Sequence, residues 1–445
     1  MSRPRIRAII AAVIVMSTTG TASAQAIDRP PRSTGGVFAQ RRTVNPNAPV
    51  QELSMMVDVF GGYDDNVTEG ASGEGSYVPR RSTYVGRAET ELRFRKARRA
   101  RSFEALGRGF LNHASIDGSQ FIGGEATVQA STDLGRRSGL NLSLSAANEP
   151  TFLFDAFGSV ASQMEGQVVS DSAPAQGVTN QRWLVGRTMG GIYRNLSTRQ
   201  RIDVQYIAEL RRPLNGSGFD SQSQTASLRH DWRFSRNFSW QTTYNYEENA
   251  QSDPTGSSRP LRSHTADLGL RYTRLLSGQR RVIAAAGGGA SRVRAFTSDT
   301  DERREFVVPT GYGLARLDLG RTWALQADVR RDVTILQGVS PEPFAADSQS
   351  LRADGLFGER LQVGVSGAYS RGAALVSDAG RFEAAGATAQ LQFILSRYAS
   401  VFTGFRFYKY RLIDIPVVPV GFPGRYDRSS VQMGVTLWLP LSGRF

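Results

Sequence analysis

The residues with the clearest chemical potential in this chain are arginines and carboxylates that recur at every second position. Around residues 82–96 one parity is charged and the other is apolar or small, so one face of an extended segment would be charged. Rings of fixed charge sort ions in a water-filled pore, and excess arginine favours anions. The alternative is that the charges pair with one another and only solvate the wall. The predicted pore-lining residues are Arg87, Glu89, Glu91, Arg93, Arg108, Arg211, Arg229, Arg233, Arg271, Arg330 and Arg352.

A second set of candidate residues lies in the long segment 148–180. Its apolar stretch 151–157 would be poorly solvated in a loop surrounded by water. We therefore predict that this loop folds inward and constricts a channel, and the alternative is a loop that stays outside. The predicted constriction residues are Glu149, Phe152, Phe154, Asp155 and Phe157.

Residues for catalysis or metal binding are scarce. The absence of cysteine excludes disulfides, thiolate nucleophiles and Cys-ligated metals. The histidines are His113, His230 and His264, and no Gly-x-Ser-x-Gly motif accompanies them. We interpret the acidic segment 299–302 as a solvated loop in preference to a cation site. The sequence therefore predicts no catalytic residue, no metal and no cofactor, and a protein that is not an enzyme.

The elements that carry these charges must be strands, because period-two alternation dominates the chain from Leu53 onward. A helix would mix the charged and apolar residues around its circumference. We count about eighteen strands, or sixteen if the two weakest segments fail. The predicted strands are 53–63, 82–96, 101–113, 121–134, 139–148, 181–194, 201–212, 222–234, 238–248, 262–275, 281–292, 306–319, 322–332, 348–357, 361–371, 382–395, 399–410 and 429–440.

The segments between these strands alternate between short and long. Short turns on one side and long loops on the other are typical of a transmembrane up-and-down β-barrel, with the short turns in the periplasm. Aromatic residues cluster beside the short turns, as in the girdle that such barrels place at the membrane boundary. A secreted β-sandwich would also show alternating polar and apolar residues along its strands, but its loops need not alternate between short and long. The predicted girdle residues are Phe94, Phe103, Tyr193, Trp232, Phe234, Phe238, Trp240, Tyr272, Trp323, Phe357 and Phe393.

The N-terminus resembles a secretory signal. Residues 1–24 combine a basic start, a short apolar core and the small residues Ala22-Ser23-Ala24, which favours cleavage before Gln25. We expect a flexible periplasmic extension over 25–52 and the barrel over 53–445. The net charge of +14 raises the question of nucleic-acid binding, but the basic residues are spread evenly and interleaved with acids. We therefore expect no nucleic-acid partner.

The end of the chain resembles the terminal strand that the barrel-assembly machinery recognises in Gram-negative outer-membrane barrels. Leu437, Leu439 and Phe445 share one parity, and the last residue is aromatic. Pro440 lacks an N–H group, so regular strand pairing is expected to end near it. Together with Gly62-Tyr63-Asp64-Asp65-Asn66, the 437–441 segment also resembles the porin-2 type of outer-membrane barrel. That resemblance implies the cell outer membrane and, for some members, an association with exopolysaccharide genes.

These observations predict a porin-like channel for small hydrophilic solutes, and a preference for anionic ones is left open. The first alternative is a conduit or accessory barrel for exopolysaccharide export, and the second is a barrel enzyme or a structural barrel. The expected partners are outer-membrane lipid and lipopolysaccharide, and the barrel-assembly machinery during insertion. A homo-oligomer and polysaccharide-export partners are left open.

Overall fold

A computed structural model of the chain describes most of the region from Val50 to Gly443. The described residues are 50–66, 82–98, 100–115, 120–150, 182–214, 220–252, 258–277, 280–296, 303–320, 322–336, 340, 342–377, 380–415 and 424–443. Within them, no helix is long and apolar enough to cross a membrane. The proposed signal segment and most of the proposed extension, residues 1–49, lie outside the described residues.

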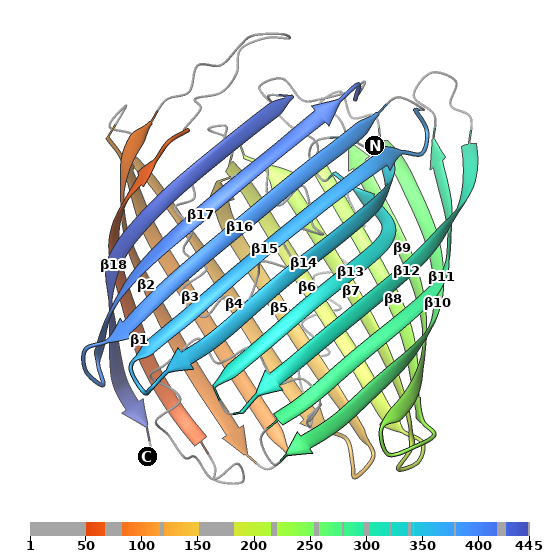
Figure 1. Cartoon of the computed structure of the whole chain (residues 1–445), viewed down its shortest axis with the longest axis horizontal. Helices are drawn as coiled ribbons and strands as arrows, with labels where there is room; N and C mark the ends of the chain where they lie inside the picture. The colour runs from red at the N-terminus through yellow and green to blue at the C-terminus, as the bar shows by residue number, and fades with distance from the viewer. Residues whose placement is uncertain are drawn as a thin grey trace, which may run out of the picture.

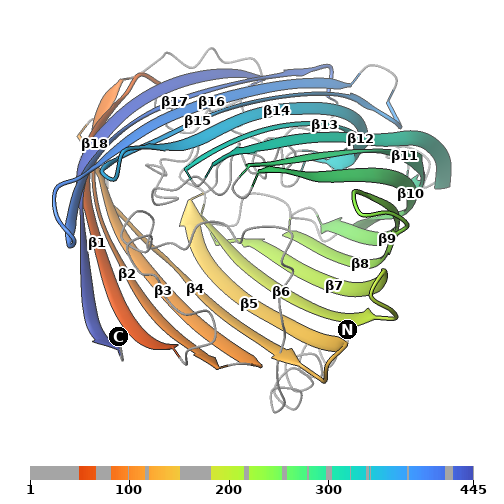
Figure 2. The same cartoon turned by 60° about the horizontal axis from the view of Figure 1, so that its bottom comes forward.

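Eighteen antiparallel strands form one sheet that closes on itself (Figures 1 and 2). Consecutive strands pair along the sheet, and β1 also pairs with β18, which completes the barrel. The strands are β1 (Val50–Asp64), β2 (Thr83–Arg98), β3 (Arg101–Ala114), β4 (Gln120–Asp133), β5 (Ser138–Pro150), β6 (Arg182–Asn195), β7 (Gln200–Pro213), β8 (Asp220–Arg233), β9 (Phe238–Ser252), β10 (Ser258–Ser277), β11 (Arg280–Phe296), β12 (Arg303–Leu319), β13 (Trp323–Ile335), β14 (Pro343–Phe357), β15 (Leu361–Ala374), β16 (Arg381–Ile394), β17 (Ala399–Ile413) and β18 (Arg425–Gly443).

The two faces of the sheet differ as the alternation predicts. On β15, Ser366 and Ser370 are buried on one parity, whereas Val365 on the other parity is half exposed. On β18, Val431, Met433, Val435, Leu437 and Leu439 are all exposed on the outward parity. An exposed apolar belt of this size on a closed barrel is what contact with hydrocarbon requires. The two predicted assembly residues Leu437 and Leu439 lie in this belt, and Phe445 lies outside the described residues.

The predicted strand number is confirmed, and the predicted boundaries fail in one direction. At the short turns they agree closely, but at the long loops the strands run further, as at Pro343 of β14 and Arg425 of β18. There the outward residues become charged while the backbone ladder continues. Arg331, Asp347 and Arg371 form one cross-strand row, with Asp347 oxygens 3.3 and 3.7 Å from the two guanidinium groups. Because the outward residues of such a row are charged, a strand predicted from alternating apolar and polar residues ends before it.

The first and last strands are fastened at the loop end by the motif Gly62-Tyr63-Asp64-Asp65-Asn66. Asp64 accepts a hydrogen bond from Arg428 Nε at 2.7 Å; the Asp64 side chain is buried and the Arg428 side chain is 10% exposed. The Asp65 carboxylate accepts from the Ser429 N–H at 2.6 Å, and Tyr426 donates its O–H to the Asn66 carbonyl at 2.7 Å. We call this set, from Asp64 to Asn66 and from Tyr426 to Ser429, the seam latch.

Two further features of the seam follow from its sequence. A Cβ atom on Gly62 would lie 2.7 Å from the Val431 carbonyl oxygen, so only glycine lets β18 approach this closely. At the other end, the expectation that regular pairing ends near Pro440 is correct only in part. The ladder shifts register between Leu53 and Ser54, opposite Pro440, and then continues to Gly443 through this bulge.

The aromatic girdle beside the short turns forms, with one exception. Ring centroids are 4.8 Å apart for Trp323 and Phe357 and 4.9 Å apart for Phe238 and Tyr272. Tyr193 was predicted to belong to this girdle, and that prediction is wrong. It pairs with Gly139 and Asp203 on the inward parity, and its O–H donates to Asp133 at 3.2 Å. The Tyr193 hydroxyl thereby finds its hydrogen-bond partner inside the barrel, where the Arg201 guanidinium stacks over the Tyr193 ring.

Candidate functional site: the inner wall of the barrel

The inner wall is the candidate functional site because it gathers most of the charged side chains of the strands. Each predicted pore-lining residue lies on the inward parity of its strand, from Arg87 on β2 to Arg352 on β14. Their degree of exposure differs: Arg87, Glu89 and Glu91 are buried, whereas Arg233 is exposed. Their proposed role in permeation stays a prediction.

Many inward arginines are neutralised by a carboxylate two residues away on the same strand, and others by a carboxylate on a neighbouring strand. Residues i and i+2 of a strand share a face, so an Arg-x-Asp or Glu-x-Arg sequence places opposite charges side by side. The pairs are Arg87–Glu89 at 2.7 Å, Arg201–Asp203 at 2.6 Å, Arg211–Glu209 at 2.6 Å, Arg229–Asp231 at 3.0 Å, Arg316–Asp318 at 3.1 Å and Arg330–Asp332 at 2.7 Å, together with Arg352–Asp354. The charges are therefore held in fixed pairs and leave little net field.

The arginine excess expected from the sequence is not found on this face. On the inward parity of the described strands, arginines and carboxylates occur in about equal numbers. The net positive charge of the chain must therefore lie elsewhere. The sequence left two alternatives open, anion preference from excess arginine or charges that pair and solvate the wall, and the balance of charge on this face favours the second.

A cluster of ion pairs spans β2 to β4. The Arg87 guanidinium is stacked 3.9 Å from the Phe110 ring centroid and binds Glu89. Arg108 bridges Glu89, at 3.7 Å, and Glu125, at 2.7 Å. These contacts join three neighbouring strands through side chains as well as through the backbone ladder. The cluster stiffens the wall and presents no isolated charge to a solute.

The wall sector formed by β14–β18, which adjoins β1, is chemically different. On its inward parity only Arg352, Asp354, Arg406 and Arg428 are charged among the described residues. Hydroxyl and amide groups take the remaining polar positions, and these can hydrogen-bond without attracting either sign of ion. The buried members are Ser348, Gln362, Ser366, Ser370, Thr388, Gln392, Ser400, Ser430 and Thr436.

At the loop end, the ends of β13 and β14 turn into the barrel. The ladder between β12 and β13 stops at the pair Gly311–Arg331, although β12 runs on to Arg303 and β13 to Ile335. The ladder between β13 and β14 continues to Ile335–Pro343. The end of β13 therefore separates from β12, while the end of β14 stays paired with both β13 and β15. We call the two strand ends, residues 332–336 and 342–346, the inner hairpin.

The packing of the inner hairpin shows that it lies inside the wall. Val333 and Ile335, which stand on the outward parity of β13, pack against the inward-facing Leu261, Val293 and Ala295 of β10 and β11. This contact is available only if β13 passes on the inner side of those strands. Val333 and Ile335 therefore contact the inner face of the same sheet at positions whose parity would otherwise place them against lipid.

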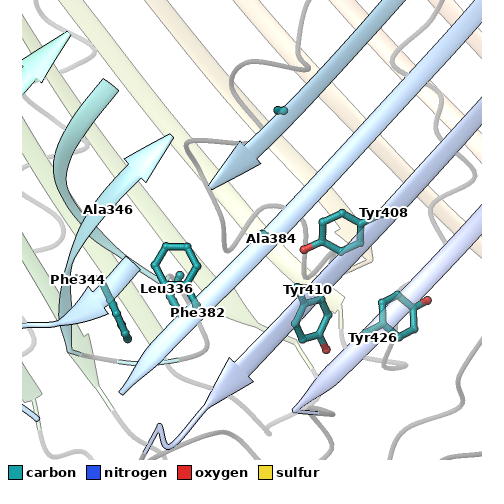
Figure 3. Close-up of a cluster of buried hydrophobic side chains, with 9 residues drawn as sticks. Leu336, Phe344, Ala346, Phe382, Ala384, Tyr408, Tyr410 and Tyr426 are labelled. Atoms are coloured by element: carbon teal, nitrogen blue, oxygen red, sulfur yellow. The ribbon is translucent and has the colours of Figure 1, made fainter. Parts of the chain in front are cut away.

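The other side of the inner hairpin packs against β16–β18. Figure 3 shows Leu336 beside the rings of Phe344 and Phe382, with Tyr408, Tyr410 and Tyr426 on the neighbouring strands. Leu336 and Phe344 are both 0% exposed. The hairpin thus contacts two parts of the inner wall, β10–β11 on one side and β16–β18 on the other. Beneath it, Asp332 interacts electrostatically with Arg330 and Asp267, and Glu247 with Asp332 and Arg330.

The predicted constriction loop cannot be compared with this hairpin. Phe152, Phe154, Asp155 and Phe157 lie outside the described residues, as does the side chain of Glu149. The backbone of Glu149 belongs to β5 and pairs with Trp183 of β6. Sequence reasoning did not identify the inner hairpin, because Val333 and Ile335 look like ordinary membrane-facing residues.

The histidines lie away from the inner wall. His113, His230 and His264 all stand on the outward parity, and His264 Nδ1 lies 2.8 Å from the Tyr244 hydroxyl. Among the described residues, no group of three or more His, Asp or Glu side chains is arranged to hold a metal ion. The Gly287-Gly288-Gly289 run lies inside β11, where the Tyr312 ring occupies the space that a Gly287 Cβ would need.

Comparison with known proteins yields structural likeness only. The sequence matches no protein-family model and no curated protein. Three solved structures from Pseudomonas aeruginosa are similar in fold. OpdQ is 12% identical with a TM-score of 0.44, covering 88% of this chain and 98% of its own. OccK2 (OpdF) in complex with glucuronate is 13% identical with a TM-score of 0.45, covering 88% and 98%. OpdL is 12% identical with a TM-score of 0.45, covering 88% and 99%.

Proposed function

We propose that the protein is a passive outer-membrane channel for small hydrophilic solutes. The observation that carries the proposal is a closed eighteen-stranded barrel with an apolar outer belt and a polar inner wall. Barrels of this size are too wide for inward side chains alone to fill, so they enclose an aqueous channel unless a segment plugs them. The long loops then face the exterior and the short turns the periplasm.

The paired charges define which solutes this channel would favour. Because inward arginines are matched by carboxylates, we propose weak ion selectivity, with solutes recognised mainly by size and hydrogen bonding. The inner hairpin supplies the narrowing at the loop end. The scarcity of charged residues on the inward parity of β14–β18 supports passage of neutral or weakly anionic polar solutes such as sugars and sugar acids.

The proposal is tested by inserting refolded protein into planar lipid bilayers. We expect discrete conductance steps and a small reversal potential in a salt gradient. Absence of steps would favour a plugged or structural barrel, which includes an accessory role in polysaccharide export. Kinship with the porin-2 type of barrel rests on the seam-latch motif and the 437–441 segment, and it remains part of the proposal.

A further inference from the structure

A set of basic residues that do not face the interior lies at the turn end of the barrel. All are exposed, and each lies in a short turn or on the last residues of a strand beside one. We call this set the turn-end crown. Its members are Lys96, Arg98, Arg101, Arg136, Arg137, Arg194, Arg199, Arg236, Arg274, Arg280, Arg360 and Arg397.

The crown differs from the other arginines of the barrel in its lack of carboxylate partners. Within the described part of the chain, no crown residue forms an ion pair, whereas the inner-wall and loop-end arginines are mostly paired. Glu359 is the acid that stands exposed among the described turns. The crown therefore carries positive charge that no carboxylate of its own neutralises, and this charge is available to an external anion.

Neighbouring turns hold the crown together as a continuous band. The Asn195 N–H donates to the Arg137 carbonyl at 2.7 Å, and the Arg233 N–H donates to the Arg199 carbonyl at 2.7 Å. The Ile394 N–H donates to the Arg360 carbonyl at 2.9 Å. Each basic turn is thus fixed beside the next strand pair. The crown extends from β2–β3 to β16–β17 and so follows most of the circumference.

The position of the crown indicates what it binds. Lys96, Arg101, Arg194 and Arg274 stand on the outward parity, one step beyond the aromatic girdle. Aromatic rings mark the boundary between hydrocarbon and head groups, and arginines just outside it reach lipid phosphates. A band around the barrel suits a surrounding leaflet, whereas a single protein or polymer partner would need only one sector.

We propose that the turn-end crown binds the head groups of anionic phospholipids in the leaflet that surrounds the short turns. Guanidinium groups pair with phosphate through two parallel hydrogen bonds, and each basic residue near an anionic membrane surface strengthens binding. The inference goes beyond the proposed channel and does not depend on conduction. It rests only on the orientation of the barrel in its membrane.

The test uses the full-length folded barrel in detergent and native mass spectrometry of bound lipid. Phosphatidylglycerol and phosphatidylcholine are titrated against the wild type and against Arg136→Gln/Arg137→Gln/Arg199→Gln. We expect the wild type to prefer phosphatidylglycerol, and the variant to lose about fivefold in its affinity for each arginine removed from a site. Phosphatidylcholine binding is expected to stay unchanged.

The matched control removes the same charge from the opposite end. Arg262→Gln/Arg294→Gln/Arg331→Gln alters arginines that are already paired with Glu248, Glu305 and Asp347, and it should keep the wild-type lipid preference. Equal loss in both variants, or no loss in the crown variant, would overturn the proposal. Loss of binding to a soluble acidic polysaccharide with unchanged lipid affinity would overturn it in favour of a polymer partner. Conductance recorded on the same variants separates these outcomes from a failure of the channel.

Discussion

The seam latch gives the sharpest stability prediction. Asp64 is 1% exposed and Arg428 10% exposed at the side chain, and they are joined where the first strand meets the last. The Asp64→Asn substitution keeps the size of the side chain but leaves the Arg428 charge buried without its carboxylate. Removing one partner of a buried pair costs about 3–5 kcal/mol, so we expect a loss of that order in the free energy of unfolding.

The assay is equilibrium unfolding in denaturant from phospholipid vesicles, followed by tryptophan fluorescence. Asp347→Asn is the control, because Asp347 forms an exposed ion pair worth less than about 1 kcal/mol. In the double variant Asp64→Asn/Arg428→Gln neither charge is left alone, so at least half of the lost stability should return. If Asp64→Asn costs no more than the control, the latch does not hold the seam and the reasoning is refuted.

Three further predictions concern the inner wall. Leu336→Asp places a charge in a site that is 0% exposed, so the inner hairpin should detach and single-channel conductance should rise; unchanged conductance would show that the hairpin does not narrow the pore. Asp332→Asn removes a carboxylate beside Arg330, which should shift the reversal potential toward anions, and a shift toward cations would contradict the assignment. Gly287→Val forces a side chain into the Tyr312 ring, so the free energy of unfolding should fall by about 1–3 kcal/mol, while Gly86→Val, with open space beside the backbone, should cost less.

The strand number and the inside–outside assignment could be predicted because hydrocarbon and water impose opposite demands on neighbouring residues. That demand ends where a strand leaves the membrane. Beyond Val329 the outward position of β13 is Arg331, so the alternation of apolar and polar residues disappears while hydrogen bonding continues. The loop-end boundaries were therefore placed too early. The turn-end boundaries were placed well, because aromatic rings and short turns mark them independently.

The candidate site was less accessible to sequence reasoning. The ion pairs of the inner wall can be read in the sequence as Arg-x-Asp and Glu-x-Arg spacings. These spacings favour mutual pairing of the charges, which the sequence left open beside an anion-selective lining. The inner hairpin has no local signal, because its position depends on β13 separating from β12. Tyr193 was misplaced for a related reason: an aromatic residue near a turn fits the girdle, but its hydroxyl finds Asp133 inside.

The central claim is that the barrel encloses a water-filled path with balanced charge, and recording in a planar bilayer under a salt gradient tests it most directly. The account predicts stepwise conductance with a reversal potential near zero. A membrane that stays silent after verified insertion would contradict the open path, and a reversal potential close to the ideal value for one ion would contradict the charge balance.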